Sequence, residues 1–358
     1  MTSISDRRMG PSSAARPNAI CSGVLAISFP TSRGPSGPVT GAVLATRRGV
    51  LAGLACASVG VARADTVLLR AGDQKGGAQA LMKAAGMLAG LPFRLEWNQF
   101  AAAAPLLEAL NADAVDLALA GDAPTTFALA AGIPARIIVP TRSSGANTAI
   151  MVPAASPIRT VADLKGRTVA TNRGSIGHSL VLAVIEAQGW AATDLRIANL
   201  LPSEAKAALA TGAVDAWCSW GVYVAQARLV DNARVVVDGT DGLMTGLSYT
   251  VARVGAIERK RDALLDFSTR LARARRWAVD HRDEYAAVLA AEIGVSPAVA
   301  RAINERDSPV AVPIDEGVIR DQQKTIDRYL SAGVIRTRLD SAKLFDTSFN
   351  PASAADPA

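Results

Sequence analysis

From residue 65 onward, the chain follows two alternating patterns of hydrophobic and polar positions. Short apolar runs predict strands at 67–71, 93–97, 115–120, 136–139, 148–152, 168–171, 195–200, 214–217 and 234–237. Stretches of helical period lie between most of these runs, and the pattern is helical from Ala256 onward. This alternation predicts an α/β protein with mixed or mostly parallel sheets and helices on both faces of each sheet.

Two segments repeat the same local plan. A strand at 67–71 leads into the loop 72–77 and a helix that we expect to reach Ala89, and a strand at 168–171 leads into the loop 172–178 and a second helix. Both loops are rich in glycine and end at a helix N-terminus. Because ligands of open α/β sheets gather beyond the carboxyl ends of the strands, we expect the two loops to face each other across a cleft and hold an anion.

The first 64 residues read as an export leader rather than as part of the fold. Arg47-Arg48 precedes an apolar run that ends at Val61, and Ala62-Arg63-Ala64 supplies a small-x-small cleavage site after Ala64. The arginine pair is typical of a twin-arginine signal, although an ordinary Sec signal remains an alternative. Either signal predicts a periplasmic protein, and the apolar run is too short for a membrane anchor.

Charge and cysteine content exclude several classes of protein. The leader holds seven Arg and one Asp, so the remainder carries 31 basic and 31 acidic residues and has no net charge to attract nucleic acid. Only Cys218 remains after cleavage, with His178 and His281. We therefore expect no disulfide, no metal site and no cofactor.

Aromatic residues gather at Trp217, Trp220 and Tyr223, in a chain that is otherwise poor in them. Spacing alone leaves two interpretations open, a buried core or the wall of a ligand site. The nearby Ser175 and His178 lack a GxSxG elbow and an evident third member, so the interpretation as a hydrolase is the weaker one.

The candidate site offers hydrogen-bond donors without acceptors. They comprise the amides of the two loops, the Ser175 hydroxyl, His178, an indole N–H and Tyr223. Such a set suits an oxyanion that never carries a proton, such as a sulfonate, sulfate or nitrate.

Several motifs together resemble the substrate-binding proteins of ABC transporters for aliphatic sulfonates, taurine and nitrate. They are Gly72-Asp73-Gln74-Lys75-Gly76, Gly121-Asp122-x-Pro124, the segment 156–166, Gly174-Ser175-x-x-His178, the segment 214–223, the segment 238–241 and the segment 346–349. The resemblance covers the whole mature chain. It implies a two-lobed, type II-like periplasmic-binding-protein fold, with lobe 1 at 65–151 plus 246–358 and lobe 2 at 152–245.

The same resemblance implies function and site. We expect an extracytoplasmic protein, a monomer, that closes on a sulfonate or similar small oxyanion and delivers it to a membrane permease driven by a cytoplasmic ATPase, with no chemistry of its own. Nitrate or a heterocyclic vitamin precursor is the alternative ligand. The residues expected to bind the ligand are Gln74, Lys75, Gly76, Asp122, Ala123, Ser175, His178, Trp217, Trp220 and Tyr223. Gly221 stands where these proteins usually have Asp, which implies a ligand without a cationic end and argues against taurine.

Overall fold

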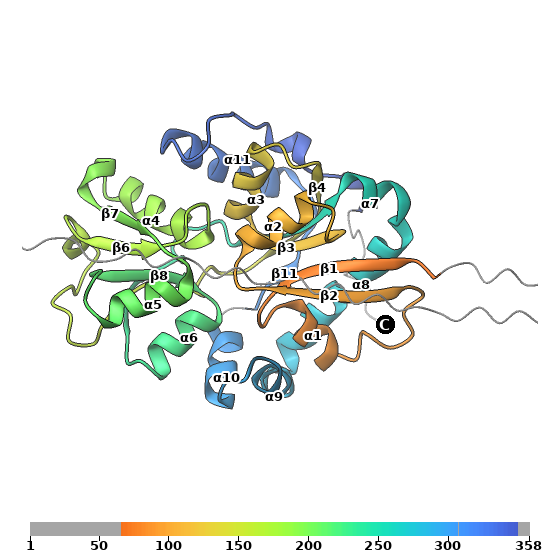
Figure 1. Ribbon diagram of the computed structural model, residues 1–358, viewed down its shortest axis with the longest axis horizontal. Helices are drawn as coiled ribbons and strands as arrows, with labels where there is room; N and C mark the ends of the chain where they lie inside the picture. The colour runs from red at the N-terminus through yellow and green to blue at the C-terminus, as the bar shows by residue number, and fades with distance from the viewer. Residues whose placement is uncertain (1–65, 307, 350–358) are drawn as a thin grey trace, which may run out of the picture. The chain divides into compact units, whose positions relative to one another are not determined.

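The structure, a computed structural model, describes residues 66–306 and 308–349. The predicted export leader lies outside these residues. The described part is built on two mixed β-sheets flanked by helices (Figure 1). None of its helices combines the length and the apolar character needed to cross a membrane.

The first sheet has six strands in the order β11-β4-β10-β3-β1-β2. Their bounds are β1 (Leu68–Gln74), β2 (Arg94–Phe100), β3 (Leu117–Gly121), β4 (Ala135–Arg142), β10 (Leu247–Arg253) and β11 (Val310–Ala311). β1 pairs in parallel with β2 and β3, whereas β10 runs antiparallel between β3 and β4. The carboxyl ends of β1 and β3 therefore lie at the same edge of the sheet.

The second sheet repeats this plan with five strands in the order β7-β6-β8-β5-β9. Their bounds are β5 (Thr148–Val152), β6 (Thr168–Thr171), β7 (Arg196–Asn199), β8 (Ala216–Trp220) and β9 (Arg234–Asp238). β6 pairs in parallel with β7 and β8, and β5 runs antiparallel between β8 and β9. The repeat in the sequence is thus a repeat of topology.

Helices cover both faces of each sheet, and Figure 1 shows α4, α5 and α6 around the second sheet in green. The helices are α1 (Ala78–Ala84), α2 (Ala103–Asn111), α3 (Asp122–Ala130), α4 (Ile176–Ala187), α5 (Pro202–Ala210), α6 (Val222–Leu229), α7 (Val254–Arg259), α8 (Arg261–Asp280), α9 (Arg282–Ile293), α10 (Pro297–Arg306) and α11 (Glu316–Ser331). α1 ends earlier than the pattern predicts, because Gly86 adopts the left-handed conformation (φ 67°) that closes a helix.

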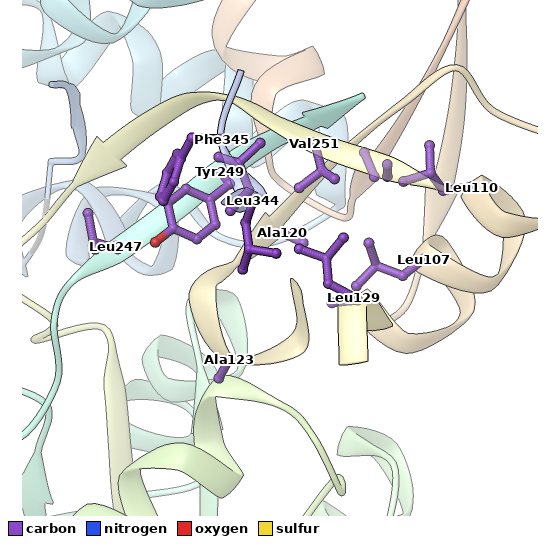
Figure 2. Close-up of a cluster of buried hydrophobic side chains, with 14 of the residues drawn as sticks. Leu107, Leu110, Ala120, Ala123, Leu129, Leu247, Tyr249, Val251, Leu344 and Phe345 are labelled. Atoms are coloured by element: carbon purple, nitrogen blue, oxygen red, sulfur yellow. The ribbon is translucent and has the colours of Figure 1, made fainter. Parts of the chain in front are cut away.

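Each sheet lies between two hydrophobic layers, because the side chains of each strand point alternately to its two faces. Ile137 packs with α2, α3 and α11 in the cluster drawn in Figure 2, whereas its neighbour Ile138 packs on the opposite face with α1 and α8. In the second sheet, Cys218 faces α4, and Trp217 faces α5 and α6. Successive side chains of a strand point to opposite faces, so a single buried strand serves both layers.

The chain passes between the two sheets after β4 and again after β9. Glycines allow these two connections to touch: a Cβ on Gly145 would approach the Gly239 carbonyl oxygen at 2.6 Å, and one on Gly246 would collide with the Ser143 carbonyl oxygen. The Ser143 N–H donates to the Gly246 carbonyl at 2.9 Å. The two connections therefore lie backbone against backbone where the sheets are joined.

Candidate functional site

A cavity of about 310 Å³ lies at the carboxyl ends of strands from both sheets. The first sheet contributes residues after β1 and β3, and the second contributes the starts of α4 and α6. This is the edge at which α/β proteins of this topology bind ligands. The loops that follow β1 and β6, the two copies of the repeated strand-loop-helix segment, both reach this cavity. The cavity is therefore the candidate ligand site.

Seven of the ten residues proposed from the sequence line this cavity. They are Gln74, Lys75, Gly76, Asp122, Ser175, Trp220 and Tyr223. The other three, Ala123, His178 and Trp217, are not among the lining residues.

Trp217 lies in the core rather than at the cleft. It is 2% exposed and packs in the hydrophobic cluster between the second sheet and α5 and α6. The predicted strand ended at Trp217, but β8 continues to Trp220. Three residues along a strand reverse the side-chain direction, so the two indoles cannot share a face.

Ala123 and His178 are also buried. Ala123 belongs to the cluster of Figure 2. The His178 Nδ1 accepts a hydrogen bond from the Gly174 N–H at 3.0 Å, and its ring centroid lies 5.9 Å from that of Tyr329. Burial, together with the nearby Arg173 charge, lowers the pKa of His178 to about 4, so its imidazole is neutral at neutral pH.

The N-termini of four helices reach the cavity, since Gly77, Gly121, Ser175 and Gly221 are both N-caps and lining residues. The two on the first sheet already hold a carboxylate. Asp73 accepts the Gln74 and Gln79 N–H groups at α1, and Asp122 accepts the Ala123 N–H at α3. Asp73 of the loop 72–77 therefore provides a carboxylate for the Gln74 and Gln79 amides, whereas the sequence predicts that the amides of this loop bind the ligand.

The two helix starts on the second sheet carry no charge. The Ser175 hydroxyl caps α4 by accepting the His178 N–H at 3.1 Å, and Gly221 caps α6 without a side chain. The first N–H groups of a helix have no acceptor within it and attract negative charge. The second lobe is thus the half of the cavity whose helix ends are suited to an anion.

The main cation of the cavity was missed by the sequence analysis. Arg275, on α8, lines the cavity, and its buried Nε has no hydrogen-bond partner among the described residues. Burial lowers the pKa of Arg275, and the nearby Asp73 carboxylate opposes this shift. A buried guanidinium is costly unless an anion pairs with it, so this arginine marks a place for one.

The pattern of α8 contained a signal for Arg275. Phe267, Leu271, Ala274 and Ala278 are buried along one face of this helix. Arg275 follows Leu271 by four residues and precedes Ala278 by three, which places it beside the same stripe. A charged residue beside the apolar stripe of a long helix indicates a charge that is partly buried.

Tyr223 and Gly221 shape the side of the cavity formed by α6. The Tyr223 hydroxyl donates to the Ala101 carbonyl oxygen at 3.2 Å and so joins α6 to the segment before α2. Its ring meets that of Trp220 edge to face, with centroids 6.1 Å apart. Gly221 has φ 54° and ψ −125°, a conformation that other L-residues rarely adopt. The backbone therefore favours glycine at this position, where Asp was the residue expected from the resemblance.

This fold and this cavity define a class. Two mixed sheets flanked by helices, with a ligand site at the carboxyl ends of strands from both, are the architecture of the periplasmic binding proteins. The chain belongs to the NMT1/THI5-like family, whose family model matches residues 94–284.

Relatives within this class share most of the chain. A protein of Escherichia coli (strain K12), whose assigned role is binding aliphatic sulfonates, is 33% identical over 299 residues, 81% of this chain and 92% of its own length. The alkanesulfonate-binding protein SsuA from Xanthomonas axonopodis pv. citri bound to MOPS is 30% identical with a TM-score of 0.74, over 79% of this chain and 99% of that one. The periplasmic aliphatic sulphonate binding protein SsuA from Escherichia coli is 31% identical with a TM-score of 0.70, over 78% and 97%.

Proposed function

We propose that this protein captures an aliphatic sulfonate, or a similar small organic oxyanion, outside the cytoplasm and delivers it to an ABC importer. The observation that carries the proposal is Arg275, a largely buried cation that lines the cavity and whose Nε has no hydrogen-bond partner in the part of the chain that the structure describes. The relatives that bind sulfonates supply the ligand class. A cavity lined by a largely buried guanidinium favours a ligand whose negative charge pairs with that guanidinium.

The ligand's two ends meet different surroundings in the cavity. The sulfonate oxygens accept hydrogen bonds from the first amides of α4 and α6 on one side and from Arg275 on the other. The organic part packs on apolar lining residues from both halves of the chain: Leu81, Ile176, Trp220, Val222 and Met244. Gln74, Lys75, Gly76, Ser175 and Tyr223 complete the proposed site at its rim and walls.

Binding closes two lobes that are joined at the glycine-rich connections. We assign residues 65–151 and 246–358 to lobe 1 and residues 152–245 to lobe 2, except that β5 pairs in the second sheet and therefore moves residues 148–151 to lobe 2. The leader 1–64 directs export to the periplasm and is removed near Ala64. The closed monomer then docks on a membrane permease whose cytoplasmic ATPase drives uptake.

The geometry disfavours a hydrolase built on Ser175 and His178. The Ser175 hydroxyl accepts the backbone N–H of His178, and the imidazole Nδ1 accepts the Gly174 N–H. With its pKa lowered to about 4, the imidazole is also a weak base. Both side chains act as local structure at the start of α4.

Calorimetric titration of the purified mature protein with methanesulfonate, propanesulfonate and nitrate tests the proposal. Sulfonate binding is expected for the wild type and a loss of about 10- to 100-fold in Arg275→Met, because a charge-assisted hydrogen bond is removed. Arg276→Met, at the exposed neighbouring position, is the matched control and should bind as the wild type does. A wild-type protein that binds no sulfonate would refute the proposed ligand class.

A further inference from the structure

Two buried carboxylates line the cavity, and the contacts of one of them, Asp73, do not explain its position there. The other, Asp122, also accepts hydrogen bonds from the Thr245 and Thr325 hydroxyls. Asp73, at the end of β1, is 2% exposed and lines the cavity. Its Oδ1 accepts the Gln74 N–H at 2.8 Å, and its Oδ2 accepts the Gln79 N–H at 3.0 Å. Gly77 passes so close over this carboxylate that a Cβ there would collide with it. A negative charge is thus fixed within a site for anions.

Asp73 and Arg275 both line the cavity and influence each other electrostatically without forming a salt bridge. Two titratable groups on neighbouring helices interact with Asp73. Arg275 on α8 stabilises the ionised form of the carboxyl group, and Tyr285 on α9 interacts electrostatically with both Asp73 and Arg275. The exposed Lys75 lies in the same loop. Arg275 therefore offers a bound ligand a positive charge that the Asp73 carboxylate partly offsets.

Hydrogen-bond donors alone do not distinguish a sulfonate from sulfate, because both present oxygen acceptors in a tetrahedral group that stays unprotonated at neutral pH. They differ in charge, because a sulfonate carries one negative charge and sulfate carries two. Repulsion by a fixed carboxylate acts on each unit of ligand charge, so it penalises a dianion about twice as much as a monoanion.

We propose that Asp73 is a specificity-determining residue that restricts the cavity to singly charged oxyanions and so separates sulfonates from sulfate. This inference rests on the proposed function, since it concerns the same cavity and ligand. Its discriminating group is the protein's own carboxylate, not a clash with the shape of sulfate.

The test compares the affinities of methanesulfonate and sulfate in Asp73→Asn by calorimetry. The substitution keeps the size of the side chain and one acceptor oxygen for α1, and it should raise the affinity for sulfate relative to methanesulfonate by about tenfold. The matched control is Asp163→Asn, which removes a carboxylate that likewise accepts two backbone N–H groups, from Arg159 and Thr160, but lies outside the cavity. Its ratio should equal that of the wild type.

A pH series gives a second readout, and its wild-type part needs no folded variant. Burial raises the pKa of Asp73 to about 6, whereas neither probe changes its charge between about pH 5 and pH 8. The affinity for sulfate relative to methanesulfonate should therefore rise as the pH falls through about 6, and this rise should vanish in Asp73→Asn.

The outcomes separate the two proposals. The wild type could bind methanesulfonate while the ratio of its affinities for sulfate and methanesulfonate is unchanged in Asp73→Asn and at every pH. In that case the role of Asp73 is overturned and the sulfonate function stands. If the wild type binds neither anion, both proposals fail. A pH-dependent ratio in the wild type together with a flat, sulfate-shifted ratio in the variant supports both.

Discussion

Trp217 and Trp220 lie on one strand, β8, but serve different parts of the molecule. Trp217 is 2% exposed in the core of the second lobe, whereas Trp220 lines the cavity at the carboxyl end of the strand. Tyr223 contacts both rings, with its ring centroid 6.3 Å from that of Trp217 and 6.1 Å from that of Trp220. One aromatic cluster therefore joins the core to the ligand site.

Replacing each indole should separate these roles. Trp217→Ala should lower the free energy of unfolding by about 3–5 kcal/mol, because it leaves a cavity in a packed core. Trp220→Ala should weaken ligand binding and leave stability nearly unchanged. Denaturant unfolding and calorimetry on both variants check this, and an equal loss of stability in the two would contradict the assignment.

Arg275→Met should not destabilise the protein without ligand. The guanidinium is largely buried and its Nε lacks a hydrogen-bond partner in the described residues, so its removal relieves a desolvation cost that offsets the lost attraction to Asp73. We expect the free energy of unfolding in urea, measured in the absence of anions, to stay the same or rise. A fall of more than about 2 kcal/mol would show that Arg275 holds the fold together instead.

His178 should make stability depend on pH. Its pKa is lowered from 6.5 to about 4 in the folded protein, so the unfolded chain binds more protons between these values. Its contribution to stability is complete above about pH 6.5 and is lost as the pH falls toward 4, by about 3 kcal/mol.

The variant His178→Asn isolates this contribution, since Asn retains an acceptor for the Gly174 N–H. The difference in unfolding free energy between the wild type and this variant should shrink by about 3 kcal/mol on going from about pH 7 to pH 4. Asp73, with its raised pKa, contributes with the opposite sign but equally in both proteins. A difference that is constant with pH would refute the prediction.

The glycine contact between the two connections should tolerate no side chain. Gly246→Ala places a Cβ against the Ser143 carbonyl oxygen at a residue with φ 68°. Gly242→Ala is the matched control, because Gly242 has φ 80° but nothing within 4 Å of its Cβ position. The control should lose about 1–2 kcal/mol of stability from backbone strain alone, and Gly246→Ala clearly more. Thermal unfolding of both variants measures the difference, and equal losses would mean that the connections move apart at no cost.

Much of the fold could be predicted because it depends on local patterns. The repeat of strand, glycine-rich loop and helix at β1 and β6 appears in the structure as equivalent positions in two sheets of the same order. Seven of the ten proposed site residues line the cavity for the same reason, since loops that follow parallel strands gather at one edge.

The errors arose where a long-range contact decides. Trp217 was misplaced because the end of β8 depends on pairing with β5, in which Trp220 lies opposite Thr148. Arg275 was missed because it is about 200 residues away from the loop of Asp73 in sequence and meets it only when α8 packs beside α1. No local period reports such an encounter.

The sequence by itself determined the class of fold and the gathering of helix starts at the ends of β1, β3, β6 and β8, where the candidate site lies. These follow from hydrophobic period, glycine placement and the orphan N–H groups of helices. Only the tertiary structure decided which helix ends carry a carboxylate of the protein and which cation lines the cavity. Asp73 already occupies the amides at α1, and Arg275 reaches the cavity from α8, because electrostatic pairing depends on distances that folding alone creates.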